Sequence, residues 1–126
     1  MLRIYTYRRP DGSCREAARD DLATLLADET AWVWLDFEAP TAEEAALLSD
    51  PLKLHPVVVE TCREPFSSAR LQDFDDHVLI TVHEARAPKE ASEDLFDTTE
   101  VDVVIGKRFL LTYHERPVDC VRQLRE

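Results

Sequence analysis

The chain has 126 residues, of which 44% are hydrophobic and 33% charged, and these values are typical of a single globular domain. Its 26 acidic residues against 15 Lys and Arg give a formal net charge of −11. Such a charge repels nucleic-acid backbones and anionic lipids, so we expect no nucleic-acid partner. No apolar run approaches the ~20 residues that a membrane-spanning helix needs, so this chain is not expected to cross a membrane.

The N-terminal part of the chain predicts an edge strand followed by a short helix. Residues 2–7 alternate apolar and polar side chains, as a half-buried strand does, and residues 10–13 have the composition of a turn. The helix that follows is expected to be capped by Asp20 or Asp21. Its apolar side chains recur at helical spacing and are Leu22, Leu25 and Leu26.

The middle of the chain predicts an internal strand and two helices. Residues 31–37 are rich in aromatic and branched side chains and predict the strand. Thr41 and Glu44 match a capping box, in which the side chain of each residue accepts a hydrogen bond from the backbone N–H of the other. A short third helix is predicted over 56–63, because Pro56 suits the first turn of a helix.

The C-terminal half predicts further strands and a last helix. The strands are expected over 70–74, 77–86, 101–105 and 108–113. The polar stretch 87–97 predicts a solvated loop, and Gly106-Lys107 predicts the turn of a hairpin whose apolar strands are covered on both faces. The last helix is expected to begin at Pro117. Its apolar stripe would consist of Val118, Val121 and Leu124.

Together these elements predict an α/β (α+β) fold, namely an α/β/α layered sandwich with a mixed, partly antiparallel sheet flanked by helices. We expect residues 1–126 to form one domain. No Gly, Asn or Pro terminates the last helix, so it is expected to continue beyond Glu126 in a longer parent protein.

The sequence offers little that is typical of an enzyme. Cys14, Cys62 and Cys120 are widely spaced, so we expect buried, reduced thiols rather than a disulfide or a structural zinc site. The histidines have no evident nucleophile and orienting acid beside them, and two glycines cannot form a phosphate-binding loop. We therefore predict no catalytic activity, with a hydrolase that uses His83 or His114 as the alternative.

One pair of carboxylates has a spacing that suits a hard cation. Glu60 and Glu64 lie four residues apart at the predicted third helix and so face the same way. Hard divalent cations take about six or more oxygen ligands, waters included, so this pair would need acids from a neighbouring segment or subunit. A solvated helix face is the alternative interpretation.

Four segments follow one another in an order that residue chemistry alone does not require. The first is Trp34-Leu35-Asp36-Phe37-Glu38-Ala39-Pro40-Thr41, and the second is Leu54-His55-Pro56 with Glu60. The third is Arg70 with Phe74-Asp75-Asp76, and the fourth is the hairpin sequence from Thr99 to His114. In this order they resemble the N-terminal cytoplasmic domain of CorA-type divalent cation transporters, a family related to ZntB.

The resemblance implies a regulatory domain at the cytoplasmic face of the cell membrane. It implies a homopentamer, joined through a long stalk helix to its own membrane-spanning region, in which divalent cations between neighbouring domains serve sensing or gating. The ion would be Mg²⁺ or Co²⁺. Glu60 matches a family acid near such an ion, whereas Thr61 stands where the family usually has a second acid. The alternatives are a ZntB-type zinc transporter domain and a free-standing acidic interaction domain of the same fold.

Overall fold

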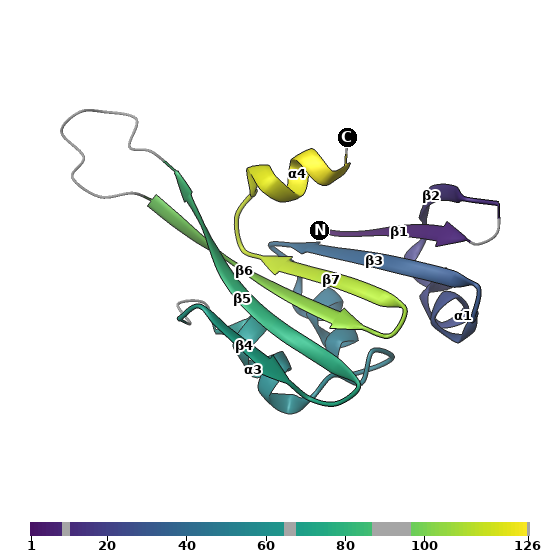
Figure 1. The fold of residues 1–126 in the computed structure, drawn as a ribbon, viewed down its shortest axis with the longest axis horizontal. Coiled ribbons are helices and arrows are strands. Elements are labelled where there is room, and N and C mark those ends of the chain that lie inside the picture. The colour runs from purple at the N-terminus through teal and green to yellow at the C-terminus, as the bar shows by residue number, and fades with distance from the viewer. Residues whose placement is uncertain (9–10, 65–67, 87–96, 126) are drawn as a thin grey trace.

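The computed structural model describes residues 1–8, 11–64, 68–86 and 97–125, which form a seven-stranded sheet with helices on both faces (Figure 1). The strands are β1 (Leu2–Arg8), β2 (Ser13–Ala17), β3 (Ala31–Glu38), β4 (Arg70–Asp73), β5 (His77–Arg86), β6 (Asp97–Gly106) and β7 (Phe109–His114). The helices are α1 (Leu22–Ala27), α2 (Ala42–Ala45), α3 (Pro56–Arg63) and α4 (Asp119–Arg125). Short 3-10 turns span Arg19–Asp21 and Ala46–Leu48. The predicted loop at 87–97 lies outside the described residues except for Asp97, which begins β6.

The strands are ordered β2-β1-β3-β7-β6-β5-β4 across the sheet. Strands β3 and β7 are paired in parallel, and the other neighbouring strands among the described residues are antiparallel. The parallel pair joins an N-terminal half-sheet to a C-terminal one, because antiparallel hairpins can form locally whereas a parallel partner requires a crossover. The prediction of a mixed, partly antiparallel sheet is confirmed.

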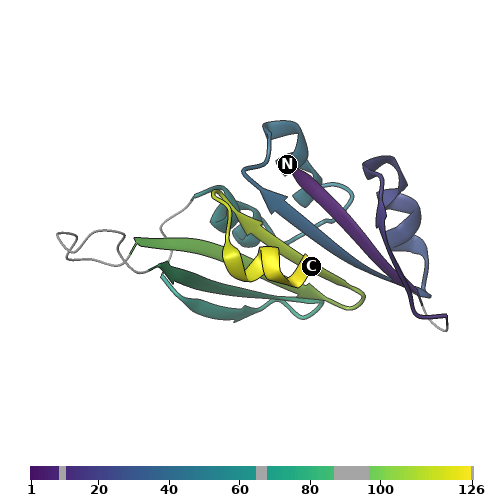
Figure 2. The same cartoon turned by 90° about the horizontal axis from the view of Figure 1, so that it is seen from above.

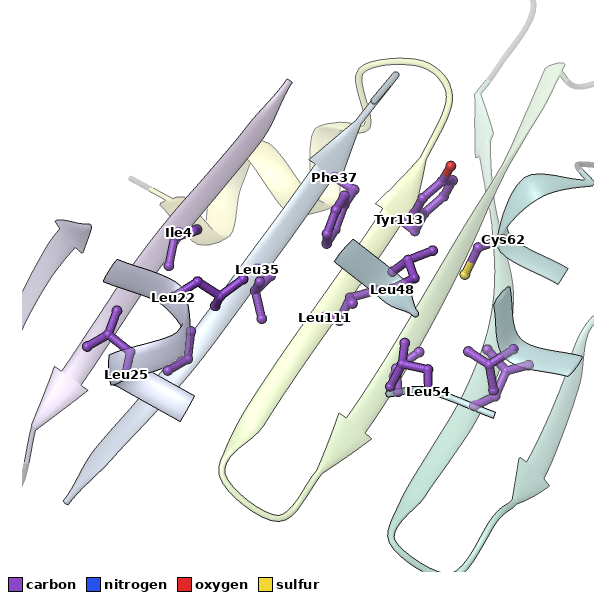
Figure 3. Packing of buried hydrophobic residues seen from close by; sticks show 14 of the residues in the cluster. Ile4, Leu22, Leu25, Leu35, Phe37, Leu48, Leu54, Cys62, Leu111 and Tyr113 are labelled. Carbon is purple, nitrogen blue, oxygen red and sulfur yellow. The ribbon is translucent and has the colours of Figure 1, made fainter. Parts of the chain in front are cut away.

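The helices form two unequal layers. Helices α1, α2 and α3 cover one face of the sheet and α4 lies on the other (Figure 2), which confirms the α/β/α arrangement. The larger core lies beneath α1 to α3, where side chains from the helices meet those of the central strands (Figure 3). Its fully buried members include Leu35, Phe37, Leu48, Val58 and Leu111. Burying such side chains is worth about 1.5–3 kcal/mol each and drives the assembly of this layer.

The smaller core lies under α4 and consists of Val101, Val118 and Val121, with Trp34 and Val103 packed at its margin. Val118 and Val121 confirm two members of the predicted stripe. Leu124 is 68% exposed, so its predicted burial is wrong. A seven-residue helix covers only the middle of this sheet face, and Ile105 near the hairpin turn is accordingly 45% exposed. The prediction that both faces of the hairpin are covered therefore fails at the turn.

The first 30 residues depart most from prediction. Strand β1 is internal, because β2 pairs with it on one side and β3 on the other, so the predicted edge strand is wrong. The side chain of Asp21 at the N-cap of α1 makes no capping hydrogen bond, and neither does the N-cap of the preceding 3-10 turn. Among the cysteines Cys62 is buried as expected, but Cys14 and Cys120 are exposed.

The capping box of α2 is confirmed in full. The Glu44 N–H donates to Thr41 Oγ1 across 3.1 Å, and the Thr41 N–H donates to Glu44 Oε1 across 3.0 Å. The other carboxylate oxygen of Glu44 accepts a hydrogen bond from the Leu2 N–H, 2.8 Å away. One carboxylate thus fixes both the start of α2 and the start of β1.

Candidate metal-ion site on α3

Helix α3 begins and is anchored as its sequence predicts. Pro56 occupies the first turn, and the Val57 N–H donates to Nδ1 of His55, the N-cap residue, across 3.1 Å. Val58 and Cys62, four residues apart, are buried against the sheet. The opposite side of the helix therefore faces solvent, and Glu60 lies there with its side chain exposed.

The structure brings the two predicted carboxylates to one end of α3. Glu64 is the C-cap residue, and its N–H donates to the Glu60 carbonyl across 3.0 Å. A hollow of about 490 Å³ beside them is lined by Ser49, Leu54, Pro56, Val59, Glu60, Arg63 and Glu64. Within the described residues the Glu60 carboxylate makes no hydrogen bond or ion pair, so its oxygens are available to a ligand.

Within the described residues these carboxylates do not form a complete cation site. No cluster of three or more His, Cys, Asp or Glu side chains in the described parts of the molecule is arranged to hold a metal ion. Carboxylate oxygens are the ligands that Mg²⁺ prefers, usually one or two of them with several waters. The residues present therefore fit a hard divalent cation as a partial set of ligands.

Thr61 is not a substitute ligand, because it is buried on the inner side of α3. Its hydroxyl donates to the Val57 carbonyl across 2.7 Å and accepts a hydrogen bond from Arg70 Nη2 at 2.6 Å. Thr61 thus connects α3 to strand β4. The position where the resemblance implies a second acid serves packing in this chain.

A pair of buried acids that the sequence analysis did not single out lies behind α3. Asp102 is 2% exposed and accepts a hydrogen bond from the Thr81 hydroxyl at 2.8 Å. Burial raises the pKa of Asp102 to about 7, and the neighbouring Glu100 carboxyl adds to this rise. An alternating acidic pattern on a strand normally indicates a solvated face, so only the position of α3 reveals that these acids are enclosed.

A second buried network holds α4 to the sheet. Asp36 accepts hydrogen bonds from Thr112 Oγ1 at 2.8 Å and from Arg125 Nη1 of α4 at 3.3 Å. His114 Nε2 lies 2.8 Å from Asp36 Oδ1, and its Nδ1 lies 2.8 Å from the Arg116 carbonyl. Both ring nitrogens face acceptors, so the arrangement favours the imidazolium, in which both carry hydrogen.

The electrostatics of this network agree with its geometry. Burial opposes the charged form of His114, but the hydrogen bonds to Asp36 and to the Arg116 carbonyl raise the pKa of the imidazole above its usual value. Burial likewise opposes ionisation of Asp36, and the hydrogen bonds from His114 and Thr112 lower the pKa of that carboxyl below its usual value. Asp36 is therefore a buried carboxylate with charged partners from β7 and α4.

The histidines do not form a catalytic arrangement in the described residues. His114 is 1% exposed and both of its nitrogens are engaged, so it cannot reach a substrate. His83 lies 3.9 Å from the Glu100 carboxylate, beyond hydrogen-bonding distance. Among the described residues, no serine or cysteine is hydrogen-bonded to either histidine. The hydrolase alternative thus gains no support from their geometry.

The fold is an α/β/α domain with two exposed acids on α3, and comparison with known proteins identifies its class. Residues 29–126 match the family model described as "CorA-like Mg2+ transporter protein". The match covers most of the chain, so the chain belongs to the CorA-like Mg²⁺ transporter family. The resemblance inferred from four sequence segments is confirmed.

Individual relatives agree with this assignment. The chain is 29% identical over 98 residues to the putative metal ion transporter YfjQ of Bacillus subtilis, covering 78% of this chain and 29% of that protein. The structure of full-length CmaX superimposes with a TM-score of 0.78 at 20% identity, over 98% of this chain and 37% of that one. The ZntB cytoplasmic domain from Vibrio parahaemolyticus has a TM-score of 0.69 at 12% identity, and the likeness covers 98% of this chain and 48% of that chain. The structural likenesses, at such low identity, show a shared fold.

The chain spans less than a third of the length of YfjQ. None of the helices in the described parts of the chain is long and apolar enough to cross a membrane.

Proposed function

We propose that this chain is the cytoplasmic, ion-responsive domain of a longer CorA-like divalent metal ion transporter, and that it senses ions or gates transport rather than catalysing a reaction. Mg²⁺ is the proposed ion, with Co²⁺ as a second cation of the same transporter. Membership of a family described by Mg²⁺ transport supports the ion, and the greater length of YfjQ supports a larger parent protein. A domain related in fold that is described as cytoplasmic supports the location.

The observation that carries this proposal is the exposed Glu60 carboxylate on α3, which has no hydrogen bond or ion pair within the part of the chain that the structure describes. Because the described residues of one chain offer only part of a ligand set, the remaining oxygens would come from water and from a neighbouring subunit. Each subunit has a formal charge of −11, so neighbouring domains repel one another. Two unit charges 4 Å apart interact by about 1 kcal/mol in water and about 4 kcal/mol at an effective dielectric of 20. A bridging cation would offset that repulsion.

In this mechanism Mg²⁺ binds between the domains of a homopentamer and stabilises the closed assembly. When internal Mg²⁺ is low, the bound ion dissociates and the population shifts toward the open assembly. The shift requires only that the ion bind one arrangement more tightly than the other. The membrane-spanning region of the parent protein would carry the transport path.

Calorimetric titration of the chain with Mg²⁺, Co²⁺ and Zn²⁺ tests this proposal. Glu60→Gln removes the charge at α3, while Glu16→Gln removes an exposed charge on β2, at the opposite edge of the sheet, and serves as the matched control. We expect Mg²⁺ binding that Glu60→Gln weakens about tenfold, equivalent to about 1.4 kcal/mol, and that Glu16→Gln leaves unchanged.

Equal binding to all three proteins would remove Glu60 from the site. Tight binding of Zn²⁺ with no response to Mg²⁺ would favour a zinc transporter domain, the alternative that the likeness to the ZntB domain supports.

A further inference from the structure

Two histidines and a phenylalanine meet where helix α3 begins beside strand β5. His55 is the N-cap residue of α3, and His77 is the first residue of β5. Both imidazoles lie against the ring of Phe74, with centroid distances of 4.4 Å for His55 and 5.4 Å for His77. His77 is 6% exposed, so its imidazole is largely removed from water. The three rings therefore connect α3, β5 and the turn that precedes β5.

The neighbours of His77 determine which of its ring nitrogens carries hydrogen. The Asp76 carboxylate lies 2.6 Å from Nδ1, and an ionised carboxylate can only accept, so Nδ1 carries a hydrogen. The backbone N–H of His55 donates to Nε2 across 3.2 Å, so Nε2 has to be a free acceptor. The neutral imidazole with its hydrogen on Nδ1 satisfies both partners.

His55 makes the same kind of bond through its other type of ring nitrogen. Its Nδ1 accepts the Val57 N–H at 3.1 Å, as an N-cap side chain does, so the hydrogen of the neutral ring lies on Nε2. The backbone N–H groups of His55 and Val57 at the start of α3 thus both depend on an imidazole nitrogen that carries no hydrogen.

Protonation of His77 changes only one of its two contacts. Nδ1 carries hydrogen in both forms, so the contact with Asp76 persists and places a negative charge beside the imidazolium. Nε2 gains a hydrogen, and two donors then face each other, the imidazolium and the His55 N–H. Protonation of His55 removes the bond from Val57 in the same way. Because a donor without an acceptor is costly away from water, the contact would open.

The sheet side of His77 adds no second counter-charge. On β6 the residue directly opposite His77 is Gly106, which has no side chain. Lys107 and Arg108 of the β6–β7 turn line the same hollow as Asp76, and the Arg108 guanidinium donates to backbone carbonyls at the end of α1.

The turn between β4 and β5 contributes two further acids. Asp73 and Asp75 flank Phe74, and Asp73 Oδ1 accepts the Asp75 N–H at 2.9 Å. Within the described residues, Asp76 is the one charged side chain that forms an ion pair or hydrogen bond with either imidazole. The response to pH therefore depends on the two imidazoles and the backbone N–H groups that they accept.

We propose that His55 and His77 form a pH-sensitive latch at the start of α3. The neutral imidazoles hold the first turn of the helix beside strand β5, and protonation of either ring releases one of the two backbone N–H groups. Histidine side chains gain their proton between about pH 8 and pH 5, so the latch opens as the pH falls through this range. The latch does not require metal binding at Glu60, so its test is separate from that of the proposed function.

The first test identifies the tautomers by NMR of the ring nitrogens in the ¹⁵N-labelled chain at about pH 8, where histidines are neutral. We expect hydrogen on Nδ1 in His77 and on Nε2 in His55. Hydrogen on Nε2 in neutral His77 would overturn the proposal, because that nitrogen could not then accept the His55 N–H.

The second test measures amide hydrogen exchange of His55 and Val57, corrected for the intrinsic dependence of exchange on pH. Protection of each amide should fall about tenfold between about pH 8 and pH 5, as the loss of one hydrogen bond would produce. Protection that stays constant while both imidazoles gain their protons would contradict the latch.

Two variants locate the effect. His77→Gln keeps an acceptor that cannot be protonated, so the His55 amide should retain its protection in acid. His83→Gln removes a histidine toward the other end of β5 and should behave as the wild type. If the His55 amide of His77→Gln still loses protection in acid, His77 is not the switch and the proposal fails. The tautomer of the wild type decides the claim even if His77→Gln does not fold.

Discussion

Asp36 and His114 are joined across strands β3 and β7 by a hydrogen bond of 2.8 Å, and both side chains are buried. Arg125 of α4 and Arg3 of β1 approach the same carboxylate at 3.3 and 3.6 Å. This carboxylate therefore connects the sheet to α4 and compensates several buried or half-buried positive charges.

Asp36→Asn should destabilise the domain strongly. The change keeps the shape of the side chain but leaves His114 and two guanidinium groups without their buried counter-charge, which costs about 3–5 kcal/mol when a buried pair is broken. Urea unfolding followed by circular dichroism measures the loss. Asp20→Asn, an exposed acid of the first 3-10 turn, is the control and should change stability by less than about 0.5 kcal/mol. Equal stability of the two variants would contradict the role of Asp36.

The Asp36–His114 pair also predicts how the free energy of unfolding depends on pH. The pKa of His114 is raised above 6.5, so its contribution to the free energy of unfolding is fully present below pH 6.5 and is lost as the pH rises through the higher folded-state value. The pKa of Asp36 is lowered below 3.8, so its contribution is present above pH 3.8 and is lost as the pH falls through the lower folded-state value. The Asp36–His114 pair therefore contributes most to the free energy of unfolding between pH 3.8 and pH 6.5.

Chemical unfolding of the wild type and of His114→Gln between pH 5 and pH 9 checks this dependence. Glutamine cannot carry the proton, so the stability advantage of the wild type should shrink as the pH rises above 6.5. An advantage that stays constant to pH 9 would show that His114 is not the titrating group. Comparison with this variant cancels the contribution of other acids, including Asp102.

The capping box at α2 predicts unequal costs for its two members. Thr41→Ala removes one N-cap hydrogen bond and should cost about 1 kcal/mol. Glu44→Ala should cost more, because the same carboxylate also accepts the Leu2 N–H and lies 3.4 Å from the N-terminal amine. Thr24→Ala, at an exposed position of α1, controls for a change of helix propensity. A smaller loss for Glu44→Ala than for Thr41→Ala would contradict the second role of Glu44.

The β6–β7 turn requires glycine at position 106, because the space that a side chain would need is occupied. A Cβ atom there would overlap the ring of Phe109, which packs against the larger core. Gly106→Ala should therefore destabilise the domain by about 1–3 kcal/mol, the usual cost of overpacking. In the double variant with Phe109→Leu, the added cost of Gly106→Ala should fall, which thermal unfolding of the four proteins would show. An unchanged cost would mean that the ring is not the obstacle.

Local chemistry made much of the fold predictable. The capping box, Pro56 in the first turn of α3 and the hairpin at Gly106 are encoded by neighbouring residues, and all three occur. Strand β2 was missed because its five side chains are exposed or half-buried, so burial imposes no alternation on its sequence. The exposure of Leu124 could not be predicted, since it depends on how much of the sheet α4 covers.

The candidate sites were only partly predictable. The spacing of Glu60 and Glu64 on α3 indicated acids on one side of a helix, and the structure places both at its solvent-facing end. The enclosure of Glu100 and Asp102 arises from the packing of α3 on a strand forty residues away. The Asp36–His114 bond depends on the parallel pairing of β3 and β7, which is a property of the whole sheet.

The most direct test of the proposed role is the effect of Mg²⁺ on self-association of this chain, measured by sedimentation velocity. A cation shared through Glu60 should raise the sedimentation coefficient of the wild type and of Glu16→Gln as Mg²⁺ increases, and should have no such effect on Glu60→Gln. Mg²⁺-dependent association of all three proteins alike, or of none of them, would contradict a cation bridge at α3.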